Sequence, residues 1–294
     1  MKIAFIGVGN IGFPMAQNFV AKGRSIVLHD LAKEKAEPLL ARGAGWAASP
    51  REAVNGADVI ITSLPGPPQV RAVMEGDGGI LAGLSKGATW VEMSTTEIGQ
   101  LKRLADEVAK RGGATLETPV TGGVKNAYKG RVTVFCAGER AVFDRIRPVL
   151  ADTSGEQIFL GPLGAAMTAK LITNMLCFVH EMALGEALML GKRAGLDLPN
   201  LVEAIQSSYG GSFVCAADSP KILDGVYNTT FPIQHACKDM RLTTDMADAL
   251  GVPMELAKYV QGFMEGARVK YGDGADCLAV VKMLEEAARI PLRR

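Results

Sequence analysis

The first half of the chain alternates short apolar runs with amphipathic stretches. The clearest runs are Lys2–Ile6, Ser25–His29 and Asp58–Leu64, and shorter ones follow at Thr89–Glu92, Thr115–Glu117 and Arg131–Ala137. Continuous apolar runs are typical of strands that are buried on both faces of a sheet. Because these runs alternate with helical patterns, they predict an α/β fold with a doubly wound, Rossmann-type parallel sheet and helices on both sides.

The pattern changes near residue 160. A long helix-forming segment extends from Ala165 to Ala194 and stops at Gly195. At about 1.5 Å per residue it would be roughly 45 Å long, enough to lead from one domain into another. Only helical patterns follow it. We therefore expect a Rossmann-type domain over 1–162 and an all-α domain over 163–294, with a long interdomain helix at about 165–194.

Charge and composition exclude several classes of protein. The 32 Lys and Arg residues balance 31 Asp and Glu residues and are scattered, which argues against a nucleic-acid partner. Five widely spaced cysteines and three isolated histidines predict free thiols and no metal site. No apolar run reaches the roughly 18–20 residues of a membrane span, and the N-terminal run is too short for a signal peptide. We expect a cytoplasmic protein without a membrane partner.

A glycine-rich turn follows the first apolar run directly. It matches the G-x-G-x-x-G pattern with the residues Gly7, Val8, Gly9, Asn10, Ile11 and Gly12. In such turns the first glycine makes the tight turn, the second lets a pyrophosphate approach, and the third lets helix and strand pack closely. The following helix N-terminus favours the phosphate charge. A glycine turn without a ligand is the alternative, but the strand–turn–helix context favours a dinucleotide site.

Asp30 bears on the choice of dinucleotide. It lies 18 residues after Gly12 and closes the second apolar run. A carboxylate at this point accepts hydrogen bonds from the adenosine ribose and repels a 2′-phosphate. The sequence therefore favours NAD over NADP, although Lys33 and Lys35 would weaken the repulsion.

The long helix carries Lys170 and Asn174, which lie four residues apart and share one face. Burial can lower the pKa of a lysine toward neutrality, so that it gives and takes a proton. Asparagine can orient a hydroxyl or carbonyl group without titrating. A solvated surface lysine is the alternative, but the apolar neighbours of Lys170 favour the catalytic interpretation.

The whole chain resembles the β-hydroxyacid dehydrogenase family, which includes hydroxyisobutyrate dehydrogenases, tartronate semialdehyde reductases and glyoxylate/succinic semialdehyde reductases. The matching segments, in the family's order, are FIGVGNIGFPMAQNF, ADVIITSLP, EMST, TPVTGG at 118–123, GPLGAAMTAKLITN at 161–174, and Phe231 with Lys238-Asp239. The family has serine at the position of Thr121 and two asparagines in place of Thr173-Asn174. The segments KLITNM and FPIQHACKDMR look closest to the glyoxylate/succinic semialdehyde reductase branch. That branch often carries an Asn-Arg pair after the second strand, where this chain has His29-Asp30.

The resemblance implies an NAD(P)-dependent oxidoreductase that interconverts a small 3-hydroxy acid and its semialdehyde. Lys170 would be the general acid and base for hydride transfer at nicotinamide C4, and Asn174 would hold Lys170 and the substrate. The implied residues for the carboxylate-bearing substrate are Thr121, Gly122, Gly123, Thr95 and Phe231. Those implied for the cofactor, besides the glycine turn and Asp30, are Leu64, Pro65, Thr95 and Lys238. A homodimer or homotetramer is also implied.

Two other functions remain as alternatives. One is a dinucleotide-binding module without turnover, and the other is an imine reductase on the same architecture. The presence of Lys170 together with Asn174 argues against both.

Overall fold

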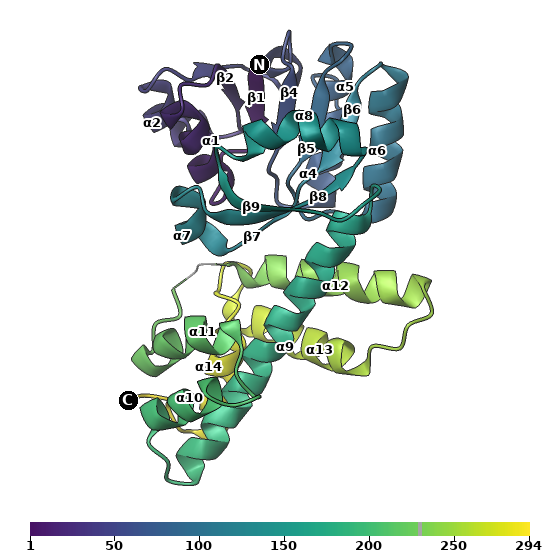
Figure 1. Ribbon diagram of the computed structural model, residues 1–294. Coiled ribbons are helices and arrows are strands. Elements are labelled where there is room, and N and C mark those ends of the chain that lie inside the picture. The colour runs from purple at the N-terminus through teal and green to yellow at the C-terminus, as the bar shows by residue number, and fades with distance from the viewer. Residues whose placement is uncertain (229–230) are drawn as a thin grey trace. The chain divides into compact units, whose positions relative to one another are not determined.

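The computed structural model describes residues 1–228 and 231–294. The chain separates into two compact units, Met1–Lys170 and Leu171–Arg294 (Figure 1).

The first unit is built on one sheet with the strand order β3-β2-β1-β4-β5-β6-β8-β7, and β9 pairs with β8. The strands are β1 (Ile3–Ile6), β2 (Ile26–His29), β3 (Gly45–Trp46), β4 (Val59–Thr62), β5 (Thr89–Glu92), β6 (Ala114–Glu117), β7 (Val120–Thr121), β8 (Val132–Gly138) and β9 (Ser154–Phe159). β1 to β6 are parallel, whereas β8 pairs antiparallel with β6 and β7. The order 3-2-1-4-5-6 is that of a Rossmann fold, so the predicted doubly wound sheet is confirmed.

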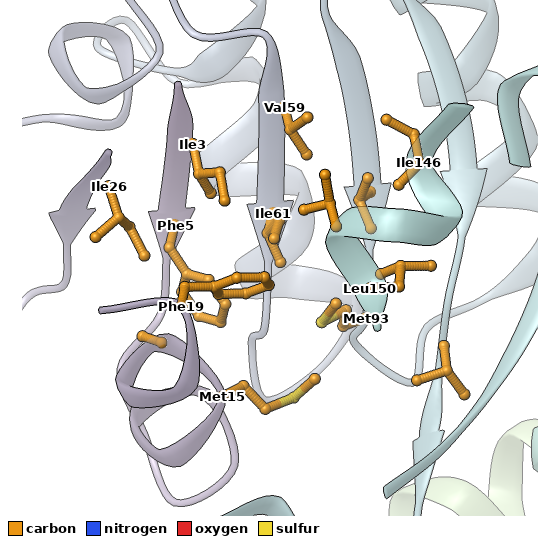
Figure 2. Packing of buried hydrophobic residues seen from close by; sticks show 14 of the residues in the cluster. Ile3, Phe5, Met15, Phe19, Ile26, Val59, Ile61, Met93, Ile146 and Leu150 are labelled. Carbon is orange, nitrogen blue, oxygen red and sulfur yellow. The ribbon is translucent and has the colours of Figure 1, made fainter. Parts of the chain in front are cut away.

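Helices cover both faces of this sheet, as Figure 1 shows. They are α1 (Gly12–Ala21), η1 (Lys33–Lys35), α2 (Glu37–Leu40), α3 (Pro50–Ala53), α4 (Pro67–Glu75), α5 (Ile80–Gly83), α6 (Ile98–Lys110), α7 (Gly123–Tyr128) and α8 (Arg140–Leu150). Because strand side chains alternate between faces, Phe5 and Ile61 pack against α1 and α8 (Figure 2). Ile60 and Trp90 pack on the opposite face with α4 and α6.

The long helix α9 runs from Ala165 to Arg193, close to the predicted 165–194. Gly195 follows with a positive φ of 81°, a conformation that ends a helix readily. By length and composition alone α9 could cross a membrane. Of its most apolar 18-residue window, 44 % is buried inside the protein.

The second unit combines residues 171–193 of α9 with shorter helices. They are α10 (Leu198–Gln206), α11 (Phe213–Asp224), α12 (Ile233–Ala249), α13 (Glu255–Tyr271) and α14 (Ala279–Ala288). Phe178 and Leu188 of α9 pack in its core with Met240 of α12 and Val281 of α14. Apart from a single bridge between Pro232 and Asp276, the described residues of this unit form no strand pairing. The predicted all-α second half is confirmed.

Candidate active site

The glycine turn between β1 and α1 has the geometry of a phosphate cradle. Gly7 has φ +99°, and a Cβ atom on it would lie 2.2 Å from the carbonyl oxygen of Ser63. A Cβ atom on Gly12 would lie 1.9 Å from the carbonyl oxygen of Gly7, whereas one on Gly9 would meet nothing within 4 Å. The first and third glycines are therefore required by packing, and the second faces open space that a pyrophosphate would fit.

Asp30 lies at the carboxyl end of β2 and braces this turn. Its Oδ2 accepts a hydrogen bond from the backbone N–H of Val8 at 2.8 Å, and its Oδ1 accepts one from Ala32 at 3.0 Å. A carboxylate oxygen can accept more than one hydrogen bond, so both retain capacity for ribose hydroxyls. The residues present thus fit a nicotinamide dinucleotide.

A row of buried polar side chains crosses the carboxyl edge of the sheet. Thr62, Glu92 and Glu117 end β4, β5 and β6, lie opposite one another in register, and are fully buried. The sequence analysis assigned no role to this row. Each of these apolar runs ends near a hydroxyl or carboxyl residue, but that local pattern does not identify the distant partners of each side chain.

Glu92 organises the two loops that were predicted to lie beside the cofactor. Its Oε2 accepts a hydrogen bond from Thr62 Oγ1 at 2.9 Å, and its Oε1 accepts one from the Ser94 backbone N–H at 2.5 Å. Ser94 Oγ in turn accepts one from the Leu64 backbone N–H at 2.8 Å. The loop of Leu64–Pro65 and the loop of Thr95 are thereby joined at one edge of the sheet.

Glu117 connects the same edge to the start of α9. It accepts hydrogen bonds from the backbone N–H groups of Gly164, of Ala166 at 3.2 Å and of Met167 at 3.1 Å. Burial raises the pKa of Glu117 to about 7, although the three hydrogen bonds by themselves would lower it. Lys170 follows one turn later and is only 9 % exposed. The solvated surface lysine that was the alternative is therefore not what the structure contains.

The TPVTGG segment forms β7 and the turn into α7. Thr121 pairs with Thr133 of β8, and Gly122 and Gly123 have φ angles of +116° and +75°. Both glycines are exposed, so the segment presents backbone rather than side chains. Helix α7 is tied to α1 by a hydrogen bond from Asn18 Nδ2 to the Ala127 carbonyl oxygen at 2.8 Å.

In the second unit, Asp239 links two of the predicted residues. Its Oδ2 accepts a hydrogen bond from Asn174 Nδ2 at 2.6 Å, and its Oδ1 lies 2.8 Å from Lys238 Nζ. Asp239 is 2 % exposed, so this ion pair is screened little by water. Phe231 is half-buried and stacks on Phe178, with ring centroids 6.0 Å apart.

The structure thus gathers most predicted residues of the first unit along one edge. The glycine turn, Asp30, Leu64–Pro65 and Thr95 follow the carboxyl ends of the neighbouring strands β1, β2, β4 and β5, whereas the Thr121–Gly123 turn lies at β7, which pairs with β8. Asn174 and Lys238 meet through Asp239 in the second unit. In a parallel α/β sheet the carboxyl edge is where ligands bind.

Comparison with known proteins indicates the family of the chain. Residues 2–161 match the model of the NAD binding domain of 6-phosphogluconate dehydrogenase, and residues 164–284 match that of the NAD-binding domain of NADP-dependent 3-hydroxyisobutyrate dehydrogenase. The 2-(hydroxymethyl)glutarate dehydrogenase of Eubacterium barkeri is 31 % identical over 97 % of this chain and 95 % of its own. The 2-hydroxy-3-oxopropionate reductase of Escherichia coli is 30 % identical over 97 % of both.

A solved structure extends the likeness to three dimensions. The 3-hydroxyisobutyrate dehydrogenase of Mycobacterium tuberculosis, solved with L-serine, superposes with a TM-score of 0.88 at 28 % identity, over 96 % of this chain and 98 % of its own. Fold and relatives together define a nicotinamide-dependent oxidoreductase of the 3-hydroxyacid dehydrogenase type. The chain belongs to the β-hydroxyacid dehydrogenase family. These findings support the dehydrogenase hypothesis and neither of its two alternatives.

Proposed function

We propose that this enzyme interconverts a small 3-hydroxy acid and its semialdehyde, with Lys170 as the proton donor and acceptor. The observation that carries the proposal is the buried Lys170, one turn beyond a helix start that Glu117 ties to the carboxyl edge of the sheet. The nicotinamide, when bound, supplies or accepts a hydride at C4. During reduction the Lys170 ammonium gives its proton to the oxygen of the former carbonyl group, and during oxidation the amine takes it back.

The other predicted residues have complementary roles in this proposal. The Thr121 hydroxyl and the exposed backbone of Gly122 and Gly123 hold the substrate carboxylate. Asn174, which donates its Nδ2 to Asp239, holds Lys170 and the substrate in place. The remaining roles go to Thr95 beside the nicotinamide and substrate, Phe231 at the substrate pocket, and Leu64, Pro65 and Lys238 at the cofactor.

A substrate screen tests the proposal. Purified protein is mixed with small 3-hydroxy acids or semialdehydes and with each nicotinamide cofactor, and turnover is followed by nicotinamide absorbance. We expect turnover of a carboxylate-bearing substrate and far less of the matched alcohol or aldehyde that lacks the carboxylate. Absence of turnover with every hydroxy acid and semialdehyde, or equal rates without the carboxylate, would contradict the proposal.

We further propose that NAD is favoured over NADP, because the Asp30 carboxylate would repel a 2′-phosphate. Replacing Asp30 with asparagine removes the charge but keeps an acceptor for the N–H of Val8 or Ala32. We expect Asp30→Asn to reduce the NAD/NADP ratio of kcat/KM by about tenfold, the effect of removing one charge repulsion of ~1–2 kcal/mol. Asp30→Ala should reduce the same ratio and also weaken both cofactors, because the glycine turn loses its brace. A wild-type preference for NADPH would refute the assignment.

We infer that the enzyme works in the cytoplasm as a homodimer or homotetramer. Large apolar side chains on α13 support the assembly, since Leu256 and Tyr259 are each 63 % exposed and lie on adjacent turns of one face.

A further inference from the structure

The side chain of Glu117 accepts its hydrogen bonds from the start of one helix, α9. The first N–H groups of an α-helix have no partners within the helix, and a negative charge near them is stabilising. Glu117 satisfies the N–H groups of Ala166 and Met167 in the first turn of α9, and that of Gly164 just before it. It does so from the last position of β6, 47 residues or more earlier in the chain.

The chain around Glu117 is fixed on both sides. The next residue, Thr118, donates its backbone N–H to the carbonyl oxygen of Glu92 at 2.7 Å, and the segment then continues to the Thr121–Gly123 turn. On the helix side, Gly164 has φ +103°, and a Cβ atom on it would lie 3.1 Å from Lys102 Cε. The left-handed φ of Gly164 favours glycine at this entry to α9.

We propose that Glu117 is a positioning residue that sets the place of Lys170 relative to the Thr121–Gly123 turn. This inference rests on the proposed function, because it assumes that Lys170 transfers the proton. Glu117 touches neither substrate nor cofactor in this assignment. It acts through α9, because the helix start it holds is one rigid turn away from Lys170. Misplacing a catalytic group by about 1 Å can reduce a rate by up to about 100-fold.

Glu117→Gln is the main test variant. The amide keeps the shape and one acceptor oxygen, but its NH2 group faces an N–H donor of the helix start, and above about pH 7 the negative charge of Glu117 is lost as well. Glu117→Asp is the conservative variant, which keeps the charge on a shorter side chain. We expect Glu117→Gln to lower kcat by about 10- to 100-fold while the KM for the cofactor changes by less than about twofold, and Glu117→Asp to recover part of kcat.

Hydrogen exchange gives a readout that does not depend on turnover. In the protein without substrate, the amides of Gly164–Lys170 should exchange faster in Glu117→Gln than in the wild type. Glu285→Gln is the matched control, because Glu285 is also a buried glutamate that accepts a backbone N–H, that of Leu292 at 2.6 Å in the other unit. We expect this control to lower the melting temperature without changing kcat or the exchange of Gly164–Lys170.

The outcomes separate the possibilities. Faster exchange with the loss confined to kcat, partly recovered in Glu117→Asp, supports a positioning role. Unchanged exchange overturns the positioning role. Faster exchange at wild-type kcat overturns it as well, and would show that Glu117 only caps the helix start. If wild-type protein turns over no hydroxy acid or semialdehyde, the proposed function fails and the positioning role fails with it, while the exchange data still decide whether Glu117 holds α9.

Discussion

Replacing Lys170 with alanine is expected to lower kcat by about 10²- to 10⁴-fold, the usual contribution of a positioned general acid and base. The alkoxide that forms during reduction would then have to take its proton from water, in a place where the wild-type lysine is buried. The dissociation constant of the nicotinamide cofactor should change little, because the variant leaves the glycine turn and Asp30 intact. The measurements are steady-state turnover and cofactor titration by fluorescence.

Lys110→Ala is the matched control for this prediction. Lys110 lies near the end of α6 with 68 % of its side chain exposed, and it pairs only with Glu107 among the ion pairs of the described residues. Surface pairs of this kind contribute little to stability, so the control should keep wild-type kcat and cofactor affinity. A fully active Lys170→Ala protein would remove the proton-transfer role and leave only the cofactor-binding fold.

The parts of the fold that could be predicted are those that the sequence pattern of a single segment determines. The apolar runs of β1, β2 and β4 and the length of α9 follow from local patterns, because burial on two faces dictates continuous apolar sequence. β3 and β7 have two residues each, too short for any period to show. The antiparallel pairing of β8 with β6 joins segments about 20 residues apart and is decided by tertiary packing.

The same distinction holds for the site. The glycine turn and Asp30 are predicted from spacing within one strand–turn–helix unit, and Lys170 is predicted from its apolar neighbours together with the family resemblance. The row of Glu92 and Glu117 could not be predicted, because the partners of each lie far away in the chain. Glu92 binds Thr62 across 30 residues, and Glu117 binds the start of α9 across about 50. A single carboxylate at the end of an apolar run does not reveal which distant donors will satisfy it.

A second buried carboxyl group, Glu181 of α9, makes the stability of the second unit depend on pH. It is 3 % exposed, and its Oε1 accepts hydrogen bonds from the thiols of Cys277 at 3.4 Å and Cys177 at 3.6 Å. Burial first, and then the negative charges of Asp218 and Asp276, raise the pKa of Glu181 to about 8. The nearby Lys221 is paired with Asp218 at 2.7 Å and offsets only part of that charge.

The sign of the effect follows from proton linkage. Because the folded-state pKa of Glu181 is raised from the ordinary 4.5 of a glutamate to about 8, the folded protein keeps a proton that the unfolded chain releases between these two values. The contribution of Glu181 to the free energy of unfolding should therefore be fully present below about pH 4.5 and be lost as the pH rises toward 8. The limiting slope from this group is about 1.4 kcal/mol per pH unit.

Glu181→Gln should remove this slope, because a neutral amide keeps an acceptor for the two thiols and never ionises. We expect the variant to match the wild type within about 1 kcal/mol near pH 5 and to exceed its free energy of unfolding by about 2–4 kcal/mol near pH 8, measured by urea denaturation across that range. Glu186→Gln, at an exposed position of the same helix, should run parallel to the wild type at every pH. If Glu181→Gln ran parallel as well, the carboxyl group would have to be ionised in the folded protein, and a further cation would be needed to compensate a charge buried beside Asp218 and Asp276.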